Sequence, residues 1–140
     1  MLARRETGRL RLRAGYARDV DVVGEVHSEE GTGGVRIVVL TGEHDLGTVP
    51  MVRDAFEAAT GNGEALVIDI SRTTFVDSSI LGAVLEARRL AVEADRGFAV
   101  ACEDAAEPVR RVLEVTGLAE ELPVHTSREA ALQALADAPT

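Results

Sequence analysis

Three short runs of aliphatic residues constrain the fold of this chain more than any other feature. They lie at Val35–Leu40, Ala65–Ile70 and Phe98–Cys102, with the sequences VRIVVL, ALVIDI and FAVAC. Runs that are apolar almost throughout are typical of strands covered on both faces of a sheet. The segments between the runs have the residue spacing and the end signals of helices. Strands and helices therefore alternate, which predicts an α/β domain with a mostly parallel sheet.

The other elements follow from turn and capping residues. A first strand is expected around Val20–Val26, and Glu29–Gly34 then forms the turn of a hairpin. Thr48 is expected to cap a helix whose first turn contains Pro50, because the first N–H groups of a helix have no partner within it. The remaining elements are expected to be, in chain order, helix Ile80–Leu90, helix Ala105–Thr116, strand Leu122–Val124 and helix Ser127–Ala136.

Charge divides the chain into two parts of opposite sign. The first 18 residues carry six arginines and one glutamate, and residues 19–140 carry nine arginines and 23 acidic residues. We expect residues 1–18 to form a solvated, flexible basic arm and residues 19–140 to form a single domain. A body with this negative charge repels nucleic acid and anionic membranes, so neither is an expected partner.

Composition also indicates the compartment. The single cysteine, Cys102, has no partner for an internal disulfide and is expected to be a small core residue rather than a reactive thiol. No apolar run follows the first arginines in the manner of a signal peptide, and no stretch approaches the roughly 20 apolar residues that span a bilayer. The chain is therefore expected to be cytoplasmic.

The segment Asp77-Ser78-Ser79 places two hydroxyl groups between a predicted strand end and a predicted helix start. Free backbone N–H groups and the positive end of the helix dipole meet at such a position, and they suit a phosphate. A phosphoserine would add about 1.5 to 2 negative charges beside Asp77 and repel an acidic or apolar partner. The same residues also suit simple helix capping. Spacing alone leaves both interpretations open.

A second polar segment, Thr41–Thr48, follows the strand predicted to end at Leu40. If this strand and the strand ending at Ile70 are neighbours, both polar segments lie at the edge of the sheet where α/β proteins bind their ligands. A Ser-His-Asp catalytic set is not expected, because His44 and Asp45 are adjacent in the chain and no Gly-x-Ser-x-Gly turn is present. His44 is predicted to be an exposed loop residue.

No metal or nucleotide site is expected. The histidines are scattered, and Asp45 and Asp77 provide only two carboxylates for a magnesium ion. The glycines of the segment Gly31–Gly34 precede a strand, whereas a phosphate-binding loop connects a strand to a helix. We therefore expect no metal ion and no cofactor.

The two polar segments resemble the two signature motifs of STAS domains. Gly42–Thr48 (GEHDLGT) resembles the first motif and Asp77–Gly82 (DSSILG) the second, and the resemblance extends over about Val20–Ala136. It implies a mixed, mostly parallel sheet of four to five strands flanked by about four helices, without catalytic activity. In the anti-sigma factor antagonist branch of the family, an anti-sigma kinase binds the unphosphorylated protein, releases its sigma factor and phosphorylates a serine at this helix start.

Carried over by position, the resemblance makes Ser79 the phosphorylated residue, with Ser78 as the alternative. The implied partners are an anti-sigma factor serine kinase of the GHKL ATPase type and a PP2C-type phosphatase. Ile80 departs from the family pattern, which commonly has glycine after the phosphorylated serine, and is expected to narrow the access of a kinase. The expected partner-binding surface consists of Asp45, Thr48, Asp77, Ser78, Ile80 and Leu81.

Two other functions compete with this one. The first is a constitutive STAS scaffold subunit in a stressosome-like or lipid-transport assembly, which would bind its partners without being modified. The second is an enzyme, either a small hydrolase that uses Ser79 or a nucleotide hydrolase, and it is the least favoured because a catalytic base and a phosphate loop are both missing. Phosphorylation of the serine pair separates the switch from the scaffold.

Overall fold

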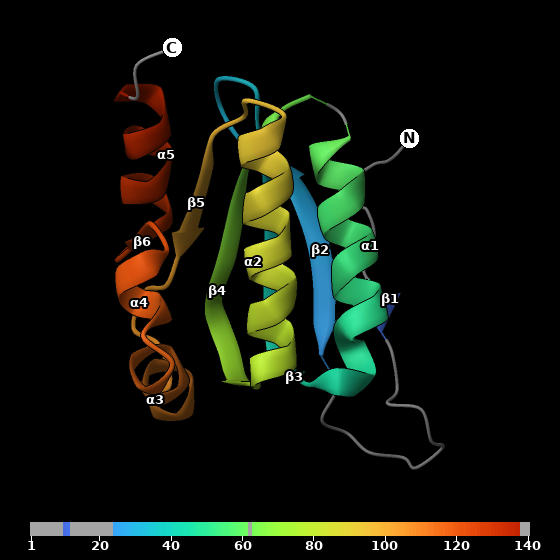
Figure 1. The fold of residues 1–140 in the computed structure, drawn as a ribbon, viewed down its shortest axis with the longest axis vertical. Helices are drawn as coiled ribbons and strands as arrows, with labels where there is room; N and C mark the ends of the chain where they lie inside the picture. Colours follow the sequence, from blue (N-terminus) through green and yellow to red (C-terminus); the bar gives the residue numbers. More distant parts are fainter. Residues whose placement is uncertain (1–9, 12–23, 62, 138–140) are drawn as a thin grey trace.

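The described part of the chain, residues 10–11, 24–61 and 63–137 of the computed structural model, forms one six-stranded sheet with five α-helices (Figure 1). The strands are β1 (Leu10–Arg11), β2 (Glu25–Glu30), β3 (Val35–His44), β4 (Ala65–Val76), β5 (Phe98–Ala101) and β6 (Val124–His125). The helices are the 3-10 turn η1 (Leu46–Thr48), α1 (Val49–Thr60), α2 (Ser78–Glu93), α3 (Glu107–Val115), α4 (Leu118–Glu121) and α5 (Arg128–Asp137).

The sheet is mixed and mostly parallel, which confirms the predicted class. Its strands lie in sequence order; β1, β2 and β3 are antiparallel neighbours, and β3, β4, β5 and β6 run parallel. The predicted hairpin joins β2 to β3, and its turn contains Gly33 and Gly34 at φ of 72° and 76°, a region that glycine adopts easily. The sheet has one strand more than expected because the two-residue strand β1 joins its edge.

The two-residue strand β1 lies within the predicted basic arm, residues 1–18. Leu10 and Arg11 pair with Val26 and Glu25 of β2, so at these two residues the arm belongs to the sheet. The rest of residues 1–18, and residues 20–23 of the predicted first strand, lie outside the described residues.

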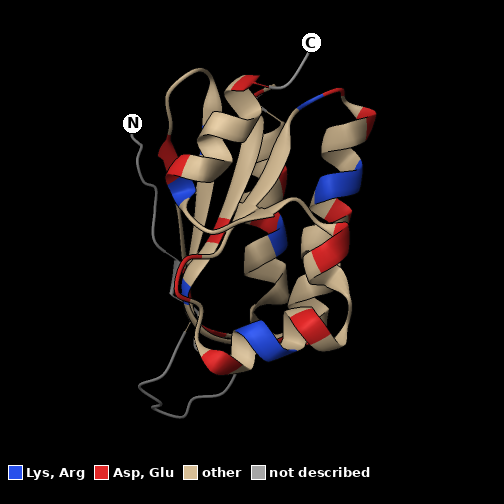
Figure 2. Ribbon diagram, turned by 90° about the vertical axis from the view of Figure 1, so that its left-hand side faces the viewer, with Lys and Arg blue, Asp and Glu red and all other residues tan. Residues whose placement is uncertain are grey.

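On the side shown in Figure 2, basic residues are interspersed with acidic ones over the described helices, so their charges partly neutralise one another.

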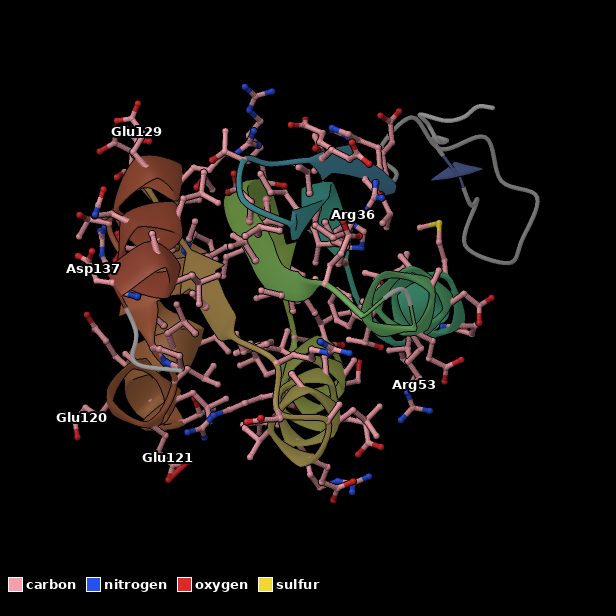
Figure 3. All side chains as sticks on the ribbon, turned by 90° about the horizontal axis from the view of Figure 1, so that it is seen from above. Arg36, Arg53, Glu120, Glu121, Glu129 and Asp137 are labelled. Carbon is pink, nitrogen blue, oxygen red and sulfur yellow. The ribbon has the colours of Figure 1, made fainter. Side chains whose placement is uncertain are left out.

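Helices cover both faces of the sheet (Figure 3). On one face, strand residues such as Leu40 and Ile68 meet Phe56 of α1, Val84 of α2 and Val109 of α3 in the larger core. On the opposite face α5 covers a smaller core, which consists of Val35, Ile37, Val39, Val67, Ala99, Ala101 and Ala131. The aliphatic strands are therefore buried on both sides, as their near-continuous apolar runs predicted.

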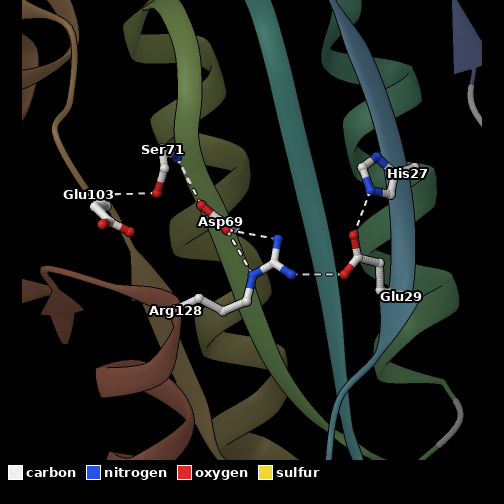
Figure 4. Close-up of polar contacts among 6 residues, drawn as sticks. All are labelled: His27, Glu29, Asp69, Ser71, Glu103 and Arg128. Atoms are coloured by element: carbon white, nitrogen blue, oxygen red, sulfur yellow. Dashed lines mark hydrogen bonds and ion pairs between the residues drawn. The ribbon is translucent and has the colours of Figure 1, made fainter.

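Arg128, the first residue of α5, ties that helix to the sheet (Figure 4). Its Nε and Nη2 lie 3.1 Å and 3.0 Å from Oδ2 of Asp69 in β4, and its Nη1 lies 2.8 Å from Oε1 of Glu29 in β2. The other Glu29 oxygen lies 2.8 Å from Nε2 of His27. Burial opposes ionisation of Glu29, but His27 and the Arg128 charge hold its pKa below the usual value. One guanidinium thus links α5 to two strands that are not neighbours.

Candidate functional site

The strands β3 and β4 end side by side. The last residues of the two strands, His44 and Val76, are paired in the parallel ladder. The next residue of each chain segment is an aspartate, Asp45 or Asp77, and each aspartate caps a helix. Both polar segments of the sequence therefore lie at the same end of the sheet, where the carboxyl ends of its parallel strands meet, as expected for an α/β domain.

Both strands extend beyond their predicted ends. β3 continues past Leu40 to His44, and β4 continues past Ile70 to Val76. The ladder between them shifts register twice in this extension, and Gly42 lies there at φ of 88°. Such irregularities bend a strand and re-aim its side chains. Polar residues such as Thr41, Glu43 and Ser71 end the apolar runs here, which is why the sequence predicted loops.

His44 is buried, so the prediction of an exposed loop histidine is wrong. Its side chain is 0% exposed, with Nε2 at 3.1 Å from the carbonyl oxygen of Thr41 and Nδ1 at 3.0 Å from the hydroxyl of Thr48. Because a carbonyl only accepts, Nε2 carries the hydrogen, and Nδ1 is left as an acceptor that faces the Thr48 hydroxyl, which also lies 3.1 Å from the carbonyl oxygen of Asp45. Burial lowers the pKa of His44, although hydrogen bonds to the backbone of Thr41 and Glu25 and the Asp45 charge oppose this effect. The ring therefore acts as a neutral structural group.

The backbone of Gly24 lies directly against this ring. A Cβ atom at position 24 would stand 2.6 Å from Cε1 of His44 and 2.4 Å from the carbonyl oxygen of Glu43. Both distances are well inside van der Waals contact, so only glycine fits here without movement. The approach of Gly24 helps to bury His44, and nothing local in the sequence around His44 signals it.

Thr48 occupies the N-cap position of α1, but the prediction that its side chain caps this helix is wrong. Its hydroxyl makes no hydrogen bond to the helix and instead contacts His44 and the backbone N–H of Asp45, the latter at 3.2 Å. The Asp45 carboxylate in turn accepts from the N–H of Gly47 at 2.9 Å. These reciprocal bonds form a capping box around η1. Thr48 therefore stabilises the turn that precedes α1.

Asp77 is the N-cap of α2. Its Oδ1 accepts from the backbone N–H groups of Ser79 and Ile80 at 3.0 Å and 3.3 Å. The hydroxyl of Ser79 donates to the same oxygen at 2.5 Å. The capping interpretation of this segment thus holds for Asp77. The N–H groups expected to hold a phosphate are already bound to a carboxylate, so a phosphate at this end of α2 must displace Asp77 or remain outside it.

The two serines differ in accessibility. Ser78 is the first residue of α2 and is exposed, and no hydrogen bond of its hydroxyl is found among the described residues. Ser79 is half-buried and its hydroxyl is held by Asp77. A kinase therefore meets a free hydroxyl at Ser78 and an occupied one at Ser79.

Three residues of the expected partner-binding surface are buried. Thr48, Ile80 and Leu81 are 4%, 0% and 3% exposed, so in this structure their side chains do not form part of the surface on which a partner was expected to bind. Ile80 and Leu81 belong to the larger core, where Ile80 is continued by Val84 one turn later. This helical spacing was a signal of burial in the sequence. The Ile80 side chain does not narrow access to the serines, because it points into the protein.

Leu46 was missed by the sequence analysis. It is the first residue of η1, and 71% of its surface is exposed. A large apolar side chain directly after Asp45 therefore lies at the same end of the sheet as Ser78, beyond the carboxyl ends of β3 and β4. The sequence carried only a weak signal for it, a single leucine within a polar segment.

Other site types receive no support from the described residues. Among them, no group of three or more histidine, cysteine, aspartate or glutamate residues is arranged to hold a metal ion. Cys102 is half-buried beside the larger core, and burial together with the charge of Asp69 raises the pKa of its thiol. Within the same residues, no helix is long and apolar enough to cross a membrane.

Fold and site together define a class of protein, a small α/β binding domain that presents a capped serine pair where a helix begins. A sequence profile described as "Mlab, STAS domain" matches residues 27–126. The chain belongs to the STAS domain family, in its anti-sigma factor antagonist branch.

Named relatives support this assignment. An anti-sigma F factor antagonist of Paenibacillus polymyxa is 35% identical over 104 residues, which cover 73% of this chain and 87% of the relative. The crystal structure of an anti-sigma factor antagonist from Mycobacterium paratuberculosis superposes with a TM-score of 0.72 at 30% identity, covering 81% of this chain and 95% of the other. The anti-sigma factor antagonist SpoIIAA in its unphosphorylated form shares the fold, with a TM-score of 0.66 at 22% identity and coverage of 82% and 99%.

Proposed function

We propose that this chain is an anti-sigma factor antagonist without catalytic activity of its own. In the unphosphorylated state it binds an anti-sigma factor serine kinase of the GHKL ATPase type, and the kinase then releases its sigma factor. Phosphorylation of the serine pair ends this binding, and a PP2C-type phosphatase restores it. The switch uses ATP and acts in the cytoplasm. The observation that carries the proposal is the exposed hydroxyl of Ser78 at the start of α2, which makes no hydrogen bond to the described residues, in a chain of this branch.

We place the phosphate on Ser78 ahead of Ser79, which reverses the order expected from the sequence. Transfer of a phosphoryl group requires the acceptor oxygen to lie in line with the leaving oxygen in the kinase site. The Ser78 hydroxyl is exposed, whereas the Ser79 hydroxyl must first leave Asp77, from which it is 2.5 Å away. Ser79 remains the alternative acceptor.

Electrostatics supports the off state. A phosphoserine adds about 1.5 to 2 negative charges at neutral pH. At Ser78 these charges would stand next to Asp77, whose carboxylate already occupies the N–H groups of Ser79 and Ile80. The phosphate is then not neutralised by the helix start, and its charge faces the partner. A kinase surface that is complementary to the unphosphorylated protein is repelled by the phosphorylated protein.

The test is phosphorylation with site mapping. The protein is incubated with ATP and each candidate GHKL anti-sigma kinase of its own organism, and intact mass and peptide mapping are recorded. We expect one added phosphate on Ser78 of the wild-type protein. The Ser78→Ala variant should gain no phosphate, and the Ser79→Ala variant should still gain one. A phosphate that persists in Ser78→Ala and disappears in Ser79→Ala would move the acceptor to Ser79. Stable binding without any modification would favour the constitutive scaffold in a stressosome-like or lipid-transport assembly.

A further inference from the structure

Leu46 stands out among the exposed apolar side chains. The large hydrophobic residues that the described part of the chain leaves exposed are Leu46, Phe75, Val92 and Val115, at 71%, 38%, 62% and 79%. Scattered exposed apolar residues are normal on a protein surface and need no function. Val92 and Val115, near the ends of α2 and α3, fit that description. Leu46 differs in how it is held and in what surrounds it.

The backbone on both sides of Leu46 is fixed. Before it, the N–H of Asp45 donates to the hydroxyl of Thr48, which is bonded to the buried His44. After it, the N–H of Gly47 donates to the Asp45 carboxylate, and the N–H of Thr48 donates to the Asp45 carbonyl at 2.9 Å. A turn that is already ordered loses little backbone entropy when one of its side chains is bound. The turn therefore pre-organises an exposed leucine.

Leu46 also lies beside the proposed switch. The pairing of His44 with Val76 brings the segment after β3 next to the segment after β4, which begins with Asp77 and Ser78. Figure 1 shows the start of α1 and the start of α2 at the same end of the sheet. The exposed residues that flank Leu46 nearby in the chain include Glu43 and Asp45, which are acidic. The leucine is therefore an apolar projection with negative neighbours.

We propose that Leu46 is the apolar anchor by which the partner kinase recognises this chain. It enters an apolar pocket of the kinase. Basic residues lie only on the side of that pocket that faces Asp45 and Glu43, and the kinase surface that faces Ser78 is acidic or apolar, so a phosphate there is repelled. The proposal rests on the proposed function, because it identifies how the same partner is held. It also accounts for specificity, since charged rims steer association while a buried apolar anchor supplies much of the affinity.

Binding of the kinase that phosphorylates the wild-type protein provides the test. Leu46→Ser is expected to weaken binding by about 10-fold or more, as loss of an anchor residue does. The matched control Val115→Ser, at an even more exposed apolar residue on α3, is expected to change binding by less than about twofold. Leu46→Met keeps an apolar side chain and is expected to retain most of the affinity. The urea midpoints of the variants should equal that of the wild type.

Kinetics of phosphorylation gives a second readout. Because Leu46 docks the protein and takes no part in the transfer, KM should rise in Leu46→Ser while kcat stays unchanged. Equal affinity of Leu46→Ser and Val115→Ser for a kinase that modifies the wild type would overturn the anchor and leave the proposed function standing. Failure of every candidate kinase to bind the wild type would remove both.

Discussion

The turns after β3 and β4 begin alike and differ in where their hydroxyl groups lie. Each follows a buried residue that ends its strand, His44 or Val76, and each continues with a capping aspartate. After β3 the hydroxyl of Thr48 is buried against His44, so the turn is closed by its own side chains. After β4 the hydroxyl of Ser78 faces solvent. One turn serves as fixed structure, and the other is open to chemical modification.

The largest expected effect comes from filling the space beside His44. Gly24→Ala places a Cβ 2.4 Å from the Glu43 carbonyl oxygen and should destabilise the protein by about 2 to 3 kcal/mol, the cost of overpacking a tight contact. Urea denaturation measures it. The control is Gly82→Ala on α2, where a Cβ meets nothing within 4 Å and should stabilise by about 0.5 to 1 kcal/mol. Equal stability of the two variants would show that the first turn is not closed against Gly24.

The next largest effect separates a buried hydroxyl from an exposed one. Thr48→Val removes the partner of Nδ1 of His44 and of the Asp45 N–H and should cost about 1 to 3 kcal/mol in unfolding free energy. Thr74→Val, the same exchange at an exposed position of β4, should change stability by less than about 0.5 kcal/mol. A neutral Thr48→Val would mean that the hydroxyl contributes nothing to the closed turn.

A smaller effect is expected at the cap of α2. Asp77→Ala leaves the N–H groups of Ser79 and Ile80 without their acceptor and should cost about 1 kcal/mol. Asp77→Asn keeps a capping oxygen and should cost less, because asparagine caps about as well as aspartate. Thermal denaturation of both variants checks this order. Equal costs for the two variants would indicate that the charge of Asp77, rather than its capping hydrogen bonds, stabilises α2.

The smallest effect expected is a dependence of stability on pH through His44. Its pKa is lowered from the usual 6.5 in the folded protein, so the unfolded chain takes up the proton first as pH falls. The stabilisation is complete above pH 6.5 and is lost as pH falls from 6.5 through the lowered folded pKa. His44→Gln should remove this part of the pH dependence. Unfolding free energies of both proteins between about pH 8 and pH 5 measure it, and parallel curves would contradict a buried neutral ring.

Much of the fold was predictable because its signals are local. The apolar runs that became β3, β4 and β5 mark strands buried on both faces, and Pro50 and Asp77 mark helix starts by the chemistry of unpaired N–H groups. The alternation of strands and helices predicted the parallel sheet, and the structure then showed that β3 and β4 are neighbours, which the sequence had left as a condition. The family motifs added the position of the serine pair.

The incorrect predictions about His44 and Thr48 arise because contacts between distant segments of the chain determine where these side chains lie. His44 is buried because Gly24 approaches it and because β3 continues through register shifts, and neither feature shows in the local sequence. Thr48 was assigned to the helix start by residue type, but the buried ring of His44 competes for its hydroxyl. The burial of Ile80 was predictable from helical spacing, because Val84 follows it one turn later in the same core.

The ion pairs of Arg128 join segments that lie far apart in the sequence. Its contacts with Asp69 and Glu29 join residues 59 and 99 positions apart in the sequence. Closing loops of this length costs entropy before any contact compensates it, and such contacts slow folding. During synthesis the smaller core stays uncovered until α5 has left the ribosome, and uncovered apolar strands attract chaperones or other chains. The docking of α5 therefore ends the period in which the apolar residues of the smaller core are exposed.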